Sequence, residues 1–231
     1  MRLTGKWTRA QEAAWWFLIL AGLFIAALIT CNLIANKFVT VDLGFKVFQV
    51  SAGVLPYPLT FLITDILSEI YGRRNTSAVV FSGFFASMLT LFVLYLGHRF
   101  PALAESPVSD LEYQTVFQNS WRVISASMLA YLTAQFFDVR FFHFIKKKTK
   151  GRYLWLRNNF STTFSQFIDT VLVTSVIFVG SLSAGAIGDL ILDGWLFKVL
   201  FAAADTALIY PIVYLFRRRF SLKQGEELSL F

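Results

Sequence analysis

Residues 56–72 read PYPLTFLITDILSEIYG, where two prolines and two acids interrupt an otherwise apolar stretch. The apolar run that contains them, residues 48–70, has about the 20 residues that a helix needs to cross the hydrocarbon core of a membrane. Because proline removes a backbone donor and clashes with the preceding turn, this sequence predicts a helix that is kinked or broken near Pro56 and Pro58.

Asp65 and Glu69 lie in the inner half of this run. A carboxylate at the bilayer centre costs about 2.5 to 3.5 kcal/mol even on lenient scales, so such residues usually face the protein interior or water. They are about 40° apart around a helix and so share one face. We therefore expect this face to point inward.

The rest of the chain has the same membrane character. Of its 231 residues, 56% are hydrophobic and 17% aromatic, whereas soluble domains are about 45 to 50% apolar. The sequence predicts an all-α integral membrane protein with one transmembrane domain, residues 1–231. Its six predicted spans are residues 15–36, 48–70, 76–97, 122–142, 160–183 and 195–216.

Lysine and arginine gather in alternate connections between these spans, in segments 2–9, 73–74, 140–157 and 217–223. Positive segments stay on the cytoplasmic side, which predicts that both termini lie there. The segment 100–119 then reads as one long external loop. The net charge of +7 follows from these loops, so we expect membrane lipid as a partner and no direct contact with nucleic acid.

Further polar residues interrupt the other predicted spans. Gln166 and Asp169 share a face with Thr162, within about 60° of one another. Asp205 lies near the middle of the sixth span, and Asn32 lies in the first, where packing and ligand binding explain it equally well. We expect Asp65, Glu69 and Asp169 to converge on one wet chamber.

The sequence gives little support to an enzyme. His98 and His143 fall at opposite faces of the predicted membrane, so they cannot share a metal ion or a catalytic triad. Carboxylates on separate helices are weak grounds for a metal site. We therefore predict no enzymatic activity, no cofactor and no metal. A purely structural role would leave the shared acidic faces and Asp205 unexplained.

Residues 58–72 resemble the characteristic motif of the queuosine precursor transporter family, also called the vitamin uptake transporter family. The resemblance extends to residues 32–37, 135–138, 157–162 and 166–169, and so covers most of residues 30–175. Phe160 departs from it, because a small residue such as glycine is expected there.

This resemblance implies a six-helix bundle similar to the substrate-binding components of energy-coupling-factor importers. It also implies a bacterial inner-membrane importer of 7-deazaguanine derivatives or queuine for salvage in tRNA modification. Carboxylates could accept hydrogen bonds from the N–H groups of such a base, and these are Asp65, Glu69 and Asp169. Amides could pair with its carbonyl and ring nitrogens, and these are Asn32, Asn158 and Gln166. Tyr57 could stack on the ring.

The energy source stays open at this point. A secondary transporter could carry a coupling proton on Glu69, Asp169 or Asp205. Alternatively, the chain could be the substrate-binding component for another vitamin-like molecule and require an ATP-driven module. The preferred precursor and a homodimer also stay open.

Overall fold

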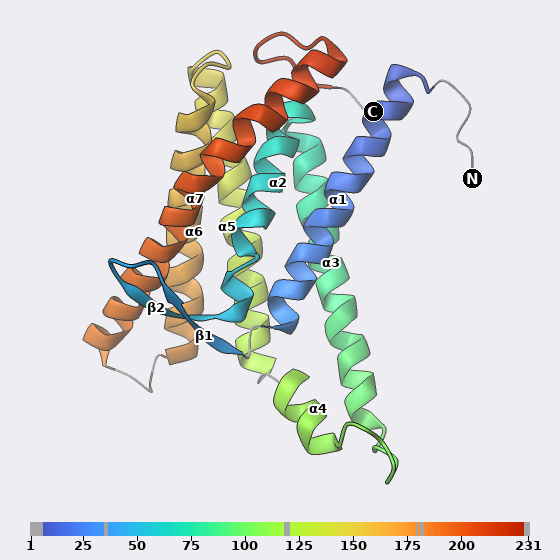
Figure 1. Cartoon of the computed structure of the whole chain (residues 1–231), viewed down its shortest axis with the longest axis vertical. Helices are drawn as coiled ribbons and strands as arrows, with labels where there is room; N and C mark the ends of the chain where they lie inside the picture. Colours follow the sequence, from blue (N-terminus) through green and yellow to red (C-terminus); the bar gives the residue numbers. More distant parts are fainter. Residues whose placement is uncertain (1–6, 35–36, 118–120, 179, 181–182, 229–231) are drawn as a thin grey trace.

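The computed structural model describes residues 7–34, 37–117, 121–178, 180 and 183–228 (Figure 1). Helices dominate this part of the chain, which confirms the predicted class. They are α1 (Arg9–Leu33), α2 (Tyr57–Ile70), α3 (Gly72–Arg99), α4 (Asp110–Phe117), α5 (Trp121–Lys148), α6 (Leu154–Phe178) and α7 (Ala184–Phe220), and two strands, β1 (Phe38–Asp42) and β2 (Val47–Ser51), form an antiparallel hairpin.

Four segments of the described chain are long and apolar enough to cross a membrane, namely 9–33, 52–70, 72–99 and 184–220. The helices α5 and α6 have 28 and 25 residues, or about 42 and 37 Å at 1.5 Å per residue. Their length would suffice, but they carry more polar side chains than the other long helices. The predicted count of six spans therefore rests on α5 and α6.

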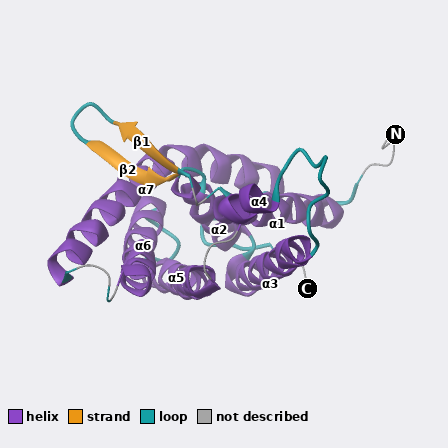
Figure 2. Ribbon diagram, turned by 90° about the horizontal axis from the view of Figure 1, so that it is seen from below, coloured by secondary structure: helices purple, strands orange, loops and turns teal. Residues whose placement is uncertain are grey.

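The predicted second span is wrong in its first part, because residues 48–51 form strand β2 rather than helix. The alternating apolar and polar side chains of the two strands raise local hydropathy as a helical span would, but with a period of two. The hairpin lies beside α7 (Figure 2), and Phe48 packs against Phe197 with ring centroids 5.1 Å apart.

The predicted break at the prolines is confirmed. A short 3-10 turn, η1 (Ala52–Val54), precedes Pro56, which caps α2, and Pro58 occupies its first turn, where the missing N–H costs nothing. Every residue from Thr60 to Ile70 is buried, because α2 lies among α1, α3, α5 and α7 (Figure 1). The central position of this helix buries Asp65 and Glu69.

The predicted external loop, residues 100–119, contains the short helix α4. Glu112 accepts hydrogen bonds from the backbone and hydroxyl of Ser109 at 2.8 and 2.7 Å, and these bonds hold the pKa of its carboxyl below the usual value. This reciprocal cap explains why the polar segment forms a helix.

The outer surface of the bundle is apolar. Leu18, Phe85, Leu89, Leu129 and Tyr214 each expose more than half of their side chains, whereas a soluble protein rarely shows such a continuous apolar surface. Phe24, Leu67 and Phe142 form the core between the helices. The surface suits lipid, and the polar residues lie inside.

Candidate functional site

The buried polar side chains of α2, α5, α6 and α7 form three layers along the bundle. Successive members on α2 are Tyr57, Asp65 and Glu69, separated by about 12 and 6 Å of helix rise. The two outer layers are named after the segments beside them, the β1–β2 hairpin and the tail, residues 221–228 after α7. The hairpin-side layer contains Tyr57, Tyr131, Gln135, Gln166, Asp169 and Lys198. The middle layer contains Asp65, Asp138, Thr162, Ser165 and Asp205, and the tail-side layer contains Glu69, Lys146, Arg157 and Arg217.

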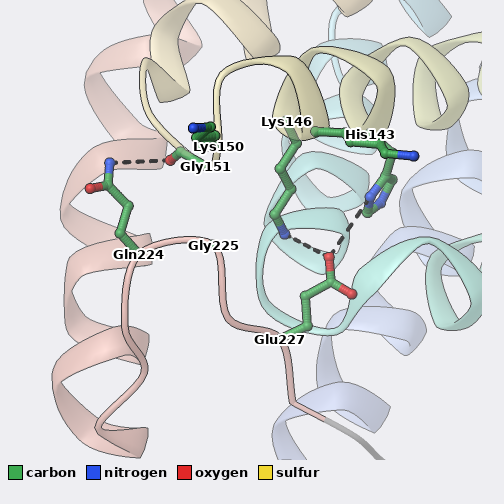
Figure 3. A pocket seen from close by; sticks show the side chains of 8 residues that line it. His143, Lys146, Lys150, Gly151, Gln224, Gly225 and Glu227 are labelled. Atoms are coloured by element: carbon green, nitrogen blue, oxygen red, sulfur yellow. Dashed lines mark hydrogen bonds and ion pairs between the residues drawn. The ribbon is translucent and has the colours of Figure 1, made fainter.

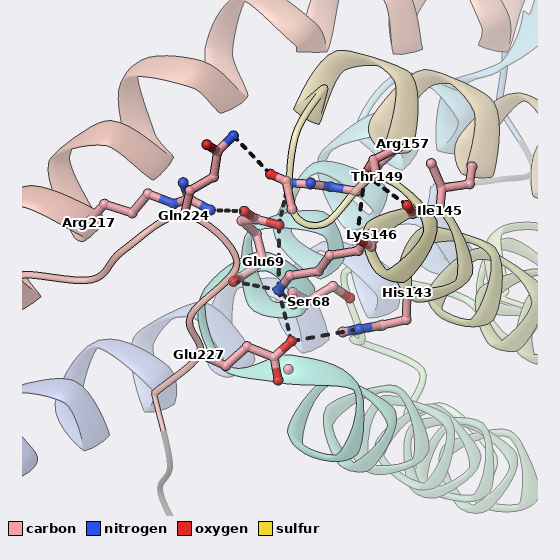
Figure 4. A network of polar contacts seen from close by, with 12 residues as sticks. Ser68, Glu69, His143, Ile145, Lys146, Thr149, Arg157, Arg217, Gln224 and Glu227 are labelled. Carbon is pink, nitrogen blue, oxygen red and sulfur yellow. Dashed lines mark hydrogen bonds and ion pairs between the residues drawn. The ribbon is translucent and has the colours of Figure 1, made fainter.

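In the tail-side layer, Glu69 is surrounded by basic groups (Figure 4). Its Oε2 lies 2.6 Å from Nη2 of Arg157 and 3.6 Å from Nζ of Lys146, and its Oε1 accepts a hydrogen bond from Arg217. Glu69 and Arg157 are both almost completely buried. The charge of Glu69 is therefore neutralised by its neighbours, and Asn158, buried directly after Arg157, lies on the same side.

The segment 221–228 after α7 lies across this layer. The backbone N–H of Leu228 donates to the Ile70 carbonyl at 2.7 Å, and Glu227 Oε1 accepts from Lys146 at 2.8 Å. Gly225 approaches Gly151 so closely that a Cβ at Gly151 would lie 2.8 Å from the Gly225 Cα. The tail thus holds the ends of α2, α5 and α6 together.

A pocket of about 360 Å³ opens beside this tail (Figure 3). Its lining residues are His143, Lys146, Lys147, Lys150, Gly151, Gln224, Gly225 and Glu227. The lysines make this pocket suited to anions rather than to an uncharged purine-like ring.

In the middle layer, Asp65 and Asp138 are completely buried. Asp65 Oδ2 accepts from the Thr162 hydroxyl at 3.5 Å, and Asp138 Oδ1 accepts from the Ser165 hydroxyl at 3.0 Å. The remaining oxygens, Asp65 Oδ1 and Asp138 Oδ2, have no hydrogen-bond donor among the described residues. Neither carboxylate forms an ion pair within the described part of the chain.

The hairpin-side layer contains one ion pair. Lys198 Nζ lies 2.7 Å from Asp169 Oδ2 and 3.2 Å from the Thr170 hydroxyl, and 4.7 Å from the centre of the Tyr57 ring. The rings of Tyr57 and Tyr131 meet edge to face at 5.9 Å. Aromatic surface and charge therefore lie together at the hairpin end of the bundle.

Unpartnered polar atoms gather around these two tyrosines. The hydroxyls of Tyr57 and Tyr131, both amide atoms of Gln135 and the carbonyl oxygen of Gln166 are buried and have no hydrogen-bond partner among the described residues. Tyr131 lies next to Gln135 and Thr60. An unsatisfied buried polar group costs about 1 to 3 kcal/mol, so such a concentration needs an explanation and makes this layer the candidate binding site.

The structure separates residues that the sequence predicted to share one chamber. Asp169 belongs to the hairpin-side layer, Asp65 to the middle layer and Glu69 to the tail-side layer. On α6, Arg157 and Asp169 are 12 positions apart, about 18 Å of helix rise. Asp205 lies close enough to act electrostatically on Asp65.

Of the other predicted residues, Tyr57, Gln166 and Asp169 lie together at the hairpin side. Asn32 donates to its own helix, at the Leu28 carbonyl, and to Met128 sulfur at 3.6 Å, so it stands at the edge of this group.

Sequence reasoning missed three contributors to this layer: Tyr131, Gln135 and Lys198. Gln135 lies in segment 135–138, which resembles a characteristic segment of the family. Nothing in the local sequence marks Lys198 as the partner of Asp169, 29 residues away. Tyr131 carried no signal beyond its apolar surroundings.

An apolar outer surface around a buried, partly unsatisfied polar interior is typical of membrane transporters. Residues 51–212 match the family described as "Putative vitamin uptake transporter". The chain belongs to this family; it is a multi-pass membrane transporter and not an enzyme.

Three relatives support this assignment. The "Probable queuosine precursor transporter" of Bacillus subtilis (strain 168) is 33% identical over 159 residues, 68% of each chain. The "Queuosine precursor transporter" of Escherichia coli (strain K12) is 26% identical over 177 residues, 74% of this chain and 71% of the relative. A Haemophilus influenzae relative is 27% identical over 135 residues, 58% and 54% of the two chains. No solved structure matches the chain.

Proposed function

We propose that this protein imports queuosine precursors, 7-deazaguanine derivatives or queuine, across the bacterial inner membrane for tRNA modification salvage. The names of its relatives support this substrate class. The structural observation that carries the proposal is the group of unpartnered polar atoms around Tyr57 and Tyr131. A guanine-like base would supply the donors, the acceptors and the ring face that this group lacks.

The proposed contacts follow from the chemistry of each side chain. The Asp169 carboxylate can accept two adjacent N–H groups of the base, as Lys198 balances its charge. Gln135 and Gln166 can pair with the carbonyl and ring nitrogens, and Tyr57 or Tyr131 can stack on the ring. Asp65 and Asn32 border this site, whereas Glu69 and Asn158 would meet the substrate on its way out.

The proposed topology has six membrane crossings, in which α5 and α6 cross with their polar faces turned inward, and both termini in the cytoplasm. The start of α1, the turn between α5 and α6 and the end of α7 lie at the same end of the bundle (Figure 1). Basic residues such as Lys147 and Arg218 gather there, as the positive-inside rule requires. Labelling of single cysteines at residues 105 and 147 from each side of the membrane tests this arrangement.

The proposed energy source is a secondary gradient. Purified chain in liposomes should accumulate labelled 7-cyano-7-deazaguanine without any ATP-driven protein. Accumulation that appears only with an added ATP-driven module would instead make the chain the substrate-binding component of a larger importer.

The function is tested in cells that cannot make the precursor and lack their own importer. Expression of this chain should restore the modified base in tRNA when precursor is supplied. Asp169→Asn should abolish restoration at unchanged membrane abundance, while Asp189→Asn, at an exposed position of α7, should restore fully. Failure of the unaltered chain, when it is present in the membrane, contradicts the proposed substrate.

A further inference from the structure

The three layers differ in how their acidic groups are balanced. Glu69 faces three basic side chains, and Asp169 faces Lys198. Asp65 and Asp138 in the middle layer have no ion-pair partner within the described part of the chain. Two completely buried carboxyl groups therefore lie together without a neutralising cation.

The geometry of this pair is close. The two carboxyl groups are close enough to interact, because the hydroxyls that donate to them, on Thr162 and Ser165, are one turn apart on α6. Two ionised carboxylates can only accept hydrogen bonds. Thr162 and Ser165 serve one oxygen of each group, at 3.5 and 3.0 Å, and the other oxygen of each is left without a donor. A proton on either group would supply a donor that these unpartnered oxygens lack.

The surroundings do not supply a substitute for that proton. Asp205 of α7 adds a further negative group within electrostatic range. Arg157 of α6 is the cation that acts on Asp65, but its guanidinium is engaged by Glu69 at 2.6 Å and by the Arg152 carbonyl at 3.0 Å. Glu69, the other acidic residue of α2, is paired with the tail-side cations and not with Asp65 or Asp138.

Ionising both of two neighbouring, completely buried carboxyl groups is strongly disfavoured, so the two groups titrate as a pair. We propose that Asp65 and Asp138 share one bound proton and that this proton is the ion whose gradient drives uptake. The pair replaces Glu69 and Asp169 as carrier, since both of those are already neutralised by fixed cations. The transport half of this inference rests on the proposed function, whereas the shared proton does not.

The position of the pair explains how coupling works. Thr162 and Ser165, which hold the pair, lie on the same helix as Asp169, which lies at the proposed substrate site. When the pair loses its proton, the two like charges repel and α2 and α5 are driven apart at this level. The proton enters and leaves on a carboxyl oxygen, so no other bond is made or broken. The substrate site and the release side are thereby linked through α6.

The first test needs no substrate. Infrared spectra of the purified chain at neutral pH should contain the carbonyl band of one protonated carboxylic acid. That band should be lost in Asp65→Asn and in Asp138→Asn, because neither variant retains the pair, and kept in Asp205→Asn and in the control Asp189→Asn. A band absent from the unaltered chain, or lost only with Asp205, overturns the proposal.

The second test separates coupling from substrate recognition. In liposomes, Asp138→Asn should exchange labelled for unlabelled precursor at a rate within about threefold of the unaltered chain. It should lose at least tenfold of the accumulation driven by a proton gradient. Loss of exchange in the unaltered chain contradicts the proposed function and leaves the infrared result standing. Accumulation that is driven by a sodium gradient, or that is unaffected in Asp138→Asn, overturns the proposal that the shared proton drives uptake.

Discussion

The tail-side and hairpin-side layers both lie largely inside the bundle, yet their charged groups are balanced in different ways. The tail-side layer surrounds one carboxylate, Glu69, with three cations and adds a tail that bonds to Lys146. The hairpin-side layer keeps one pair, Asp169 and Lys198, amid unpartnered tyrosine and glutamine atoms. The ion pairs of the tail-side layer hold helices together, although Nε of Arg157 and Nε of Arg217 have no hydrogen-bond partner among the described residues. In the hairpin-side layer, the uncharged atoms without a partner leave capacity for a ligand. The comparison separates residues that stabilise the fold from residues that we propose to bind the substrate.

The comparison predicts the largest stability loss for Glu69→Gln. Removing this carboxylate leaves Arg157 buried without its partner, and breaking a buried pair in this way costs about 3 to 5 kcal/mol. Thermal unfolding of the purified protein in detergent should show a clearly lower midpoint. The double variant Glu69→Gln with Arg157→Gln should recover part of it, and an unchanged midpoint in the single variant would remove the proposed locking role.

Asp169→Asn should have the opposite profile. We expect uptake to fall at least tenfold, because the base loses its acceptor and Lys198 its counter-charge. The unfolding midpoint should fall less than in Glu69→Gln, because Lys198 keeps its bond to Thr170. Uptake and unfolding measured on the same preparation check this, and normal uptake would exclude Asp169 from the site.

Gln135→Leu sharpens the contrast, since it removes two polar atoms that have no partner. The protein should be as stable or more stable, by on the order of 1 kcal/mol, because an unsatisfied buried amide is lost. Uptake should nevertheless fall several-fold. Thr133→Val, on the exposed side of α5 where the hydroxyl bonds only to its own helix, is the matched control. Reduced stability together with normal uptake would make Gln135 a packing residue.

The smallest effect is expected at the tail. Glu227→Gln weakens the contact with Lys146, but the Glu227 side chain is 40% exposed, so the stability change should stay below about 1 kcal/mol. Proteolysis of segment 221–228 should become faster while the unfolding midpoint barely moves. Equal protease resistance would show that the Leu228 backbone bond alone holds the tail.

Much of the helical frame was predictable from local sequence. Pro56 and Pro58 predict where α2 starts, and the spacing of Asp65 with Glu69, and of Gln166 with Asp169, predicts which faces turn inward. Both inferences need only helix geometry and the cost of burying polar groups in lipid. They therefore hold without knowledge of the neighbouring helices.

The division into layers was not predictable in the same way. Glu69 meets Arg157 across 88 positions and Arg217 across 148, and no local pattern encodes such pairs. The hairpin was missed because its alternating apolar residues satisfy a hydropathy window without forming a helix. Relative heights of the helices decide which acid meets which cation, and these heights follow from packing of the whole bundle.

In the proposed topology, the brevity of α2 has a consequence for access from the external side. Its 14 residues cover about 21 Å, less than the hydrocarbon thickness of about 30 Å, so the hairpin and η1 must seal the remainder. That seal is attached to α7 at the Phe48–Phe197 contact and at Lys46 with Asp193, 2.5 Å apart on an exposed surface. The tip residue Phe45 is 71% exposed. An antibody fragment raised against this tip would bind the hairpin directly and is expected to inhibit transport without entering the membrane.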